Sequence, residues 1–368
     1  MITYCSNIHP GESFEDIFSN LQTHLLEVKK AVSPDDPFPI GLRLSNRATL
    51  EIDEKSSSRF HAWCQGNNCF VPTINGFPYG PFASVPVKEN VYLPDWRDSE
   101  RVIYSKRLAT LLDSWLPQGM VGSISTVPIG FKKYVDSKDQ PIIRKNLIEV
   151  LEHIDRLRQK SGKEIILSLE PEPGCLLETM REVVRFFEEI ELPGVLRESL
   201  GVCFDTCHQA VEFEEPAESL NLLSGAGIKI SKVQVSSALR IVHFNRSLLE
   251  KFYEPIYLHQ VVIRNPDGTL SRYNDLPEAL KERAGERGEE WRIHFHLPIF
   301  LEEMGQYRTT RFFIEKTLPL LDNKMLLEVE TYTWEVLPPE LQMETVTQSI
   351  IRELKWLKAQ RDEANGRP

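Results

Sequence analysis

One pattern recurs along the whole chain and limits the folds that it can adopt. Short apolar runs end in polar or glycine residues, and amphipathic helical stretches such as residues 142–159 and 180–190 follow most of them. Strands that alternate with helices form parallel sheets, because each helix returns the chain to the edge where the next strand begins. The strand-like runs span residues 2–5, 40–44, 69–74, 120–125, 164–169, 201–204, 228–233 and 325–329.

Eight such units within 368 residues favour a (β/α)8 barrel, the TIM-barrel fold, over an open doubly wound sheet. A G-x-G-x-x-G motif does not follow the first run, which argues against dinucleotide binding. The pattern breaks once, where two strand-like runs flank Asn265-Pro266-Asp267-Gly268, a strong hairpin signal. We therefore interpret residues 238–300 as a hairpin-containing insertion after the seventh strand. We see no interdomain linker and expect residues 1–368 to form a single barrel domain.

Charge and composition exclude several classes of function. The chain carries 54 acidic and 43 basic residues, a formal net charge of −11, which argues against binding to nucleic acid or to an anionic membrane surface. We find neither a signal peptide nor an apolar run long enough to span a membrane, and expect a cytoplasmic protein. The six cysteines form no C-x-x-C pair, which predicts reduced and partly buried thiols.

Chemistry-bearing side chains follow the predicted strands. In a barrel the carboxyl ends of the strands meet at one mouth, so these residues are expected to converge there whatever their separation in the sequence. A single histidine or glutamate at a strand end is more often structural than functional, and only this convergence favours a site. The candidates are Asn7, His9, Asn75, Tyr79, Glu170, Asp205, His208, Gln234, His294, His296, Glu330 and Trp334.

The run Asp205-Thr206-Cys207-His208 has two interpretations. Asp205 or Thr206 could cap a following helix, or Asp205 and His208 could share a metal ion with other strand ends. Several carboxylates and imidazoles at one mouth would be costly without a cation, because like charges repel and burial removes water. A mixed carboxylate and imidazole set suits a divalent metal, with Zn²⁺ and Mn²⁺ the favoured ions.

Strand parity helps to choose among neighbouring residues. Side chains alternate along a strand, so Glu328 and Glu330 point the same way, and we prefer Glu330 as a ligand because it lies nearer the carboxyl end. Glu328 is expected one layer deeper. His294 and His296 also share a face, as a paired imidazole contribution to the metal requires.

These elements resemble the xylose isomerase-like barrel superfamily, which includes sugar isomerases, ketose epimerases and endonuclease IV. The resemblance rests on Leu169-Glu170, Phe204-Asp205-Thr206-Cys207-His208, His294-Phe295-His296 and Glu330-Thr331. Over nearly the whole chain the sequence also resembles the EboE family, described as metabolite traffic proteins. That finer likeness rests on Tyr4–Glu12, Asn75–Gly80 and His294–Phe300.

The resemblance implies metal ligands at Glu170, Asp205 and Glu330, with His208 a ligand or a substrate contact. The histidine expected on the seventh strand is Gln234 here, a weaker ligand, and His294 or His296 could make up the loss. It also implies a small-molecule metabolite as the partner and leaves room for a homo-oligomer.

Three functions follow from this interpretation. The first is a metal-dependent isomerase or epimerase of a small polyhydroxylated or α-hydroxy-carbonyl metabolite, with Glu170 and Glu330 as catalytic base and acid. Its substrate would be held by Asn7, His9, Asn75, Tyr79, Gln234 and Trp334, with Phe77 helping to wall the pocket. The second is a metabolite-binding or delivery protein without catalysis, which Gln234 favours. The third is a small-substrate phosphoesterase related to endonuclease IV, which the acidic composition disfavours.

Overall fold

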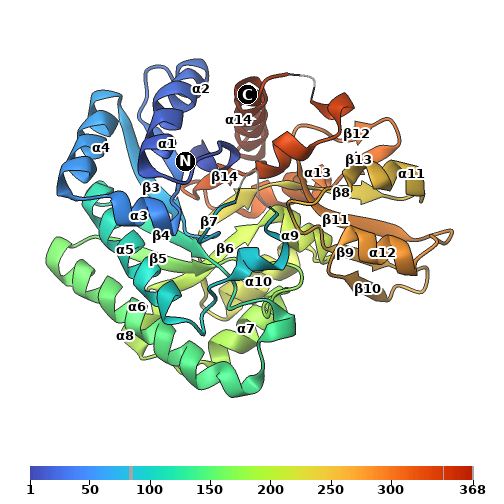
Figure 1. Cartoon of the computed structure of the whole chain (residues 1–368), viewed down its shortest axis with the longest axis horizontal. Coiled ribbons are helices and arrows are strands. Elements are labelled where there is room, and N and C mark those ends of the chain that lie inside the picture. Colours follow the sequence, from blue (N-terminus) through green and yellow to red (C-terminus); the bar gives the residue numbers. More distant parts are fainter. Residues whose placement is uncertain (83–85, 343, 367–368) are drawn as a thin grey trace.

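Eight parallel strands form a nearly closed barrel in the computed structural model, which describes residues 1–82, 86–342 and 344–366 (Figure 1). Neighbouring strands follow the order β1-β14-β7-β6-β5-β4-β3-β2. This confirms the TIM-barrel prediction. The strands are β1 Ile2–Tyr4, β2 Phe38–Arg43, β3 Cys69–Asn75, β4 Val121–Thr126, β5 Glu164–Leu169, β6 Leu200–Asp205, β7 Lys229–Val235 and β14 Leu327–Val329.

Helices cover the outside of the barrel, and the long ones carry recognisable end signals. The stretches predicted at 142–159 and 180–190 lie in α6 and α7. Helix α6 ends at Gly162 in the left-handed conformation (φ 73°), and Thr179 and Glu182 form a capping box at the start of α7. The helices are α1 Phe14–Asn20, α2 Leu26–Val32, α3 Asn46–Glu51, α4 Glu54–Gly66, α5 Ser99–Trp115, α6 Gln140–Ser161, α7 Met180–Glu189, α8 Gly194–Arg197, α9 Thr206–Val211, α10 Pro216–Gly225, α11 Arg246–Leu249, α12 Leu276–Glu282, α13 Arg311–Thr317 and α14 Val346–Ala364.

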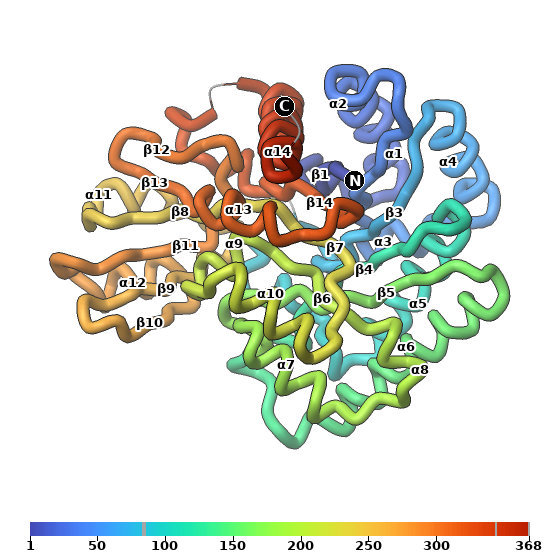
Figure 2. The backbone as a smooth tube through the Cα atoms, turned by 180° about the vertical axis from the view of Figure 1, so that it is seen from behind, coloured from blue at the N-terminus to red at the C-terminus, as the bar shows by residue number. Residues whose placement is uncertain are grey.

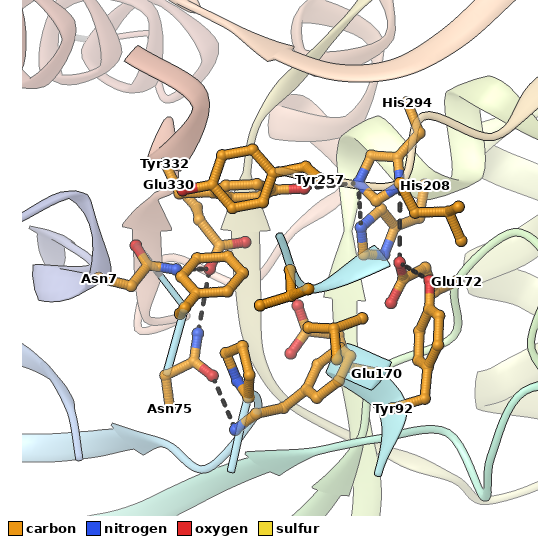
Figure 3. Close-up of a pocket in the computed structure, with 16 residues that line it drawn as sticks. Asn7, Asn75, Tyr92, Glu170, Glu172, His208, Tyr257, His294, Glu330 and Tyr332 are labelled. Carbon is orange, nitrogen blue, oxygen red and sulfur yellow. Dashed lines mark hydrogen bonds and ion pairs between the residues drawn. The ribbon is translucent and has the colours of Figure 1, made fainter. Parts of the chain in front are cut away.

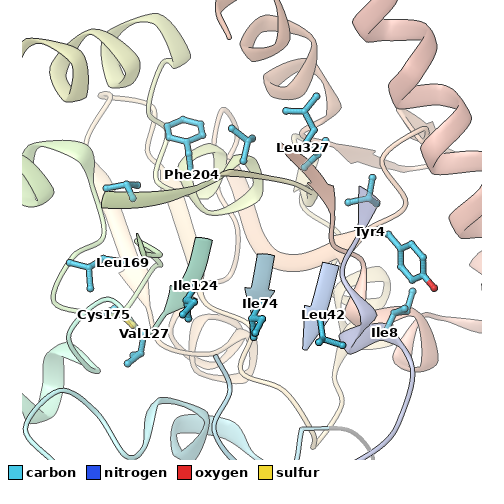
Figure 4. Packing of buried hydrophobic residues seen from close by; sticks show 14 of the residues in the cluster. Tyr4, Ile8, Leu42, Ile74, Ile124, Val127, Leu169, Cys175, Phe204 and Leu327 are labelled. Atoms are coloured by element: carbon cyan, nitrogen blue, oxygen red, sulfur yellow. The ribbon is translucent and has the colours of Figure 1, made fainter. Parts of the chain in front are cut away.

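The barrel separates apolar and polar side chains by strand parity. Outward-facing residues such as Leu42, Ile74 and Ile124 belong to the main hydrophobic core (Figure 4). The opposite parity is largely polar: the register aligns Thr73 with Ser123, and Glu328 with Gln234 and Asp205. Side chains of this parity point into the barrel, and those nearest the carboxyl ends of the strands reach the barrel mouth.

A second sheet interrupts the barrel between β7 and α13 (Figure 2). Its strands pair in the order β10-β9-β11-β8-β13-β12, and every pair is antiparallel. The predicted hairpin is present between β9 and β10, where Gly268 adopts φ 86° and its N–H donates to the Asn265 carbonyl (2.9 Å). The strands are β8 Ser237–Ile241, β9 Val261–Arg264, β10 Leu270–Tyr273, β11 Glu290–Leu297, β12 Glu303–Met304 and β13 Tyr307–Thr309.

The inserted sheet extends past the boundary expected at residue 300. Strands β12 and β13 are short and mostly polar, so the sequence carries no apolar run to announce them. They join the sheet through backbone pairing of β13 with β8. The strand that matters most for the mouth is β11, whose pairing with β8 is irregular between Ile293 and Leu297, at His294 and His296.

No helix among the described residues is both long and apolar enough to cross a membrane. All six cysteines are unpaired, as predicted, and all are buried.

The closure of the barrel depends on a close approach at Gly41. The Thr3 hydroxyl donates to the Pro39 carbonyl (2.6 Å) and accepts from the Gly41 N–H (3.2 Å), joining β1 to β2. A Cβ atom on Gly41 would lie 2.0 Å from Glu328 Oε1 and 2.4 Å from the Tyr4 carbonyl oxygen. The interior at this point therefore has no space for a side chain.

Substitution of Gly41 should destabilise the protein. We expect Gly41→Ala to lower the free energy of unfolding by about 1–3 kcal/mol, because backbone and a buried carboxylate must move. Urea titration followed by circular dichroism measures this loss. Gly66→Ala is the control: it lies at the exposed end of α4 with open space around its Cβ, and should be neutral or slightly stabilising. Equal stability of Gly41→Ala and wild type would contradict the packing argument.

Candidate metal centre

A pocket opens at the carboxyl end of the barrel strands, where the inserted sheet and the loops after β3 and β14 meet (Figure 3). Its acidic and imidazole groups lie at the base, and aromatic and aliphatic side chains face them. The lining residues are Asn7, Asn75, Phe77, Pro78, Phe82, Val87, Val91, Tyr92, Glu170, Glu172, His208, Tyr257, Leu258, His294, Glu330 and Tyr332.

Three carboxylates converge at the mouth from three strands. Glu170 follows β5, Asp205 ends β6 and Glu330 follows β14, and one oxygen of each lies within 4.8 Å of the other two. All three side chains are buried, and neither Glu170 Oε2 nor Asp205 Oδ2 has a hydrogen-bond partner. Burial, the largest cause, and the neighbouring acids raise the pKa of Glu170 to about 8 and that of Glu330 well above its ordinary range. The negative charge of the three ionised carboxylates would therefore be only partly compensated.

Asp205 serves both of the roles that the sequence suggested. Its Oδ1 accepts from the N–H groups of Cys207 (2.6 Å) and His208 (3.0 Å), which caps α9, and from the Ser236 hydroxyl (2.6 Å). These bonds fix the carboxylate and leave Oδ2 free beside Glu170 and Glu330. One oxygen builds the helix start, and the other is available to a ligand.

Glu330 is held by two amides. Asn7 Nδ2 donates to its Oε1 at 2.8 Å and Asn75 Nδ2 donates to the same atom at 3.0 Å (Figure 3). Both asparagines were predicted at the mouth, and the structure brings them together with Glu330 there. These two hydrogen bonds orient the Glu330 carboxylate.

Three histidines approach one another through their Nε2 atoms. His294 Nε2 lies 3.1 Å from His208 Nε2 and 3.0 Å from His296 Nε2. His208 Nδ1 lies 2.9 Å from the Pro171 carbonyl oxygen, and His296 Nδ1 lies 2.8 Å from that of Glu330. A carbonyl oxygen only accepts, so each Nδ1 carries the proton and each Nε2 presents a lone pair.

His294 also carries its proton on Nδ1, because this atom faces the side-chain amide of Gln260. Gln260 Nε2 donates to the Pro173 carbonyl at 2.7 Å, so its Oε1 must face His294 Nδ1, 2.7 Å away, and accept its proton. Burial lowers the pKa of all three rings, which favours their neutral forms with the Nε2 lone pairs directed at one another, and the Tyr332 hydroxyl lies 3.4 Å from His294 Nε2. Burial lowers the pKa of His208 to about 3 and that of His296 to about 4, so neither ring takes up a second proton near neutral pH. Converging neutral nitrogens are the donor set of a metal site.

Two further donors lie beside the imidazoles and were not predicted. Glu172 accepts from Tyr92 Oη (2.7 Å) and keeps Oε2 unpartnered, and Cys207 lies with His294 and His296 in another group of close donors. Burial raises the pKa of Glu172 to about 8. The sequence signal that could have identified Glu172 is its position two residues after Glu170.

A buried ion pair lies below the three carboxylates. Lys232 on β7 contacts Glu328 on β14, and both side chains are fully buried. Gln234, with its amide nitrogen turned toward Glu328, donates to Glu328 Oε2 (2.9 Å). The Lys232 charge counteracts part of the rise in the pKa of Glu170 and Glu330, and Glu328 lies one layer deeper than Glu330, as expected.

Four predicted substrate contacts lie away from the pocket lining. The side-chain amide of Gln234 donates to Glu328. His9 lies 3.1 Å from Tyr4 Oη and stacks on His24, because the short 3-10 helix after β1 turns it outward. Tyr79 donates to Glu100 (3.3 Å), and Trp334 packs into the main core. Phe77, in contrast, does line the pocket.

Comparison with known proteins supports the fold. No family model matches the chain, and no curated protein matches its sequence. Among solved structures, it is similar to a xylose isomerase domain protein from Planctomyces limnophilus (15% identity, 93% of this chain and 92% of that one, TM-score 0.54). A D-allulose 3-epimerase from Methylomonas sp. in complex with D-allulose matches at 11% identity (98% and 96%, TM-score 0.55). A xylose isomerase-like TIM barrel protein from Mycobacterium smegmatis in complex with magnesium matches at 12% (98% and 99%, TM-score 0.52). The chain thus has the fold of xylose isomerase-like TIM barrels.

The raised pKa of Glu170 predicts the pH dependence of the metal-free protein. Folding raises this pKa from an ordinary 4.5 to about 8, so the folded state binds the proton more tightly, and stability is lost as the pH rises between these values. Glu170→Gln stays neutral, so its stability relative to wild type should increase with pH, by on the order of 1 kcal/mol per pH unit.

Urea unfolding in the presence of a chelator, between about pH 5 and pH 9, measures this difference. Glu164→Gln, exposed at the other end of β5, should follow wild type at every pH. A stability difference between Glu170→Gln and wild type that does not change with pH would contradict the burial of an uncompensated carboxyl group.

Proposed function

We propose that the protein is a metal-dependent isomerase or epimerase of a small α-hydroxy-carbonyl or polyhydroxylated metabolite. One observation carries the proposal: Asp205 belongs both to a close group of donors with Glu170 and Glu330 and to a close group with His208 and His296, and its Oδ2 has no partner. The Nε2 atoms of His208 and His296 also converge on that of His294. Such a set fits a divalent cation, Zn²⁺ or Mn²⁺ by its mixture of oxygen and nitrogen donors. The proposed ligands are Glu170, Asp205, His208, His294, His296 and Glu330.

The comparisons support this class of reaction without fixing the substrate. Structures of similar fold include an epimerase described with D-allulose and a barrel described with magnesium. Both place a small molecule or a divalent ion in the same architecture, and we extend that use to this chain.

The proposed chemistry is proton transfer at a carbon next to a carbonyl. A bound divalent ion would supply charge stabilisation for the oxygens of the substrate and so make that carbon-bound proton more acidic. Glu170 and Glu330 approach from separate strands, and their raised pKa values suit carboxyl groups that take up and return a proton near neutral pH. Asn7 and Asn75 fix the direction of the Glu330 carboxylate.

A second candidate is a protein that binds and delivers a metabolite without converting it, as the likeness to EboE suggested. The commitment of Gln234 to Glu328 favours it, since the seventh strand then adds no ligand to the centre. The phosphoesterase alternative receives less support: the described residues that line the pocket include no lysine or arginine to hold a phosphoryl group.

Metal content tests the centre directly. We expect the purified, desalted protein to retain near one or more equivalents of zinc or manganese, measured by inductively coupled plasma mass spectrometry. Asp205→Ala should lose the metal because a fixed ligand is removed, whereas Asp36→Asn, an exposed carboxylate, should retain it. Equal metal content in Asp205→Ala and wild type would refute the ligand assignment.

Hydrogen exchange distinguishes enzyme from binder. In deuterated water the metal-loaded protein should incorporate deuterium next to the carbonyl of a ketose or α-hydroxy ketone, followed by NMR. We expect Glu170→Gln to slow this exchange by roughly 10²–10⁴-fold, because the proton acceptor is gone. Metal retention without exchange on any compound of a broad panel would favour the binding protein.

A further inference from the structure

The pocket has two chemically different sides. Acidic, amide and imidazole side chains form one group, which we call the base, and the other lining residues are aliphatic and aromatic, with polar side-chain atoms in the hydroxyls of Tyr92, Tyr257 and Tyr332. The base comprises Asn7, Asn75, Glu170, Glu172, His208, His294 and Glu330, and the facing side comprises Phe77, Pro78, Phe82, Val87, Val91, Tyr92, Tyr257, Leu258 and Tyr332.

We infer that the ligand is amphipathic, with a pair of adjacent oxygens on one edge and an apolar body on the other, rather than a polyol. The inference rests on the proposed function, because the oxygens would meet the metal centre. It narrows the substrate to an α-hydroxy-carbonyl or enediol compound that carries an aromatic or alicyclic group.

Three aromatic residues of this side pack against one another, and we call them the roof: Phe82, Tyr257 and Tyr332. The ring of Phe82 lies 5.1 Å from that of Tyr257 and 5.0 Å from that of Tyr332, and the last two are 5.0 Å apart. They come from the loop after β3, from the insertion and from the segment after β14, so three separate parts of the chain build it. The ring centroid of Tyr332 lies 4.6 Å from that of His296. The Tyr332 hydroxyl lies 3.4 Å from His294 Nε2, which places the roof directly against the histidine cluster (Figure 3).

The capacity of the base for hydrogen bonds is limited and consists mostly of acceptors. Asn7 and Asn75 each donate one amide N–H to Glu330, and the second N–H of Asn75 is directed to Cys5 Sγ (3.4 Å), so one N–H of Asn7 remains. Tyr92 donates to Glu172 and accepts from Gln260 (2.6 Å), so its hydroxyl is also engaged. The buried atoms that remain without partners are acceptors: Asn7 Oδ1, Glu170 Oε2 and Glu172 Oε2.

A polyol does not match this distribution. It carries a hydroxyl on each carbon, and the roof offers partners only at the hydroxyls of Tyr257 and Tyr332, so hydroxyls that face its ring surfaces would lose water without gaining a partner. A flat apolar body gains from the same surface, because rings stack on Phe82, Tyr257 and Tyr332 and displace water from them. The free Asn7 Oδ1 can still accept one hydroxyl beside the metal-binding edge.

Three probes with one metal-binding group test the inference on the zinc-loaded protein by isothermal titration calorimetry. Acetohydroxamate, benzohydroxamate and D-erythronohydroxamate share the chelating pair of oxygens and differ in a methyl, a phenyl and a polyol tail. We expect benzohydroxamate to bind at least about tenfold more tightly than acetohydroxamate, and the polyol no more tightly than acetohydroxamate. Tighter binding of the polyol than of benzohydroxamate would overturn the inference.

A variant of the apolar side tests where the selectivity arises. Val91→Asn places an amide on the wall of the pocket, so the preference for benzohydroxamate over acetohydroxamate should fall several-fold. Val121→Asn, an exposed valine at the start of β4, should keep the wild-type preference. An unchanged preference in Val91→Asn would show that the phenyl group binds elsewhere.

Failure of the proposed function gives a different result from failure of this inference. If the protein takes up no zinc and binds no acetohydroxamate, the metal centre is refuted and the ligand class with it. If acetohydroxamate binds only when zinc is present, and benzohydroxamate gains nothing, the centre stands and the apolar-bodied ligand is refuted.

Discussion

The electrostatic cost of the barrel mouth is the constraint on which the rest of this structure depends. Glu170, Asp205 and Glu330 are buried together, and oxygens on two of them have no partner. Buried like charges and unsatisfied acceptors are both unfavourable, and Lys232, one layer below and paired with Glu328, compensates part of the charge. A divalent cation would neutralise the remaining negative charge of the three carboxylates, which is why the fold and the proposed cofactor fit each other.

Backbone contacts set the protonation of the histidine cluster. His208 and His296 turn their Nδ1 atoms to main-chain carbonyls, and Gln260 does the same for His294 through an amide that is itself fixed. The tautomer therefore follows from the course of the chain after β5, in the insertion and after β14. The irregular pairing of β11 is part of this arrangement, because it occurs where the two histidines leave the sheet.

The candidate metal donors and the roof come from different parts of the chain. The donors lie at strand ends and on β11, whereas the roof comes from loops and consists of three aromatic rings, two of which carry hydroxyls. Separating the two allows one barrel to keep a metal centre while the loops adapt to a ligand, which is how barrels of this kind support varied chemistry.

The sequence by itself determined the alternation of strands and helices, the hairpin and the identity of the donors at strand ends, because periodicity and strand parity are local properties. It predicted Glu170, Asp205, Glu330 and the histidines, but it also placed His9, Tyr79, Gln234 and Trp334 in the pocket. Only the tertiary structure decided where those four point, and it added Glu172, Gln260 and the roof. Such contacts join segments far apart in the chain, and their side-chain directions depend on local turns, on buried partners such as Glu328, and on packing that no single stretch of sequence encodes.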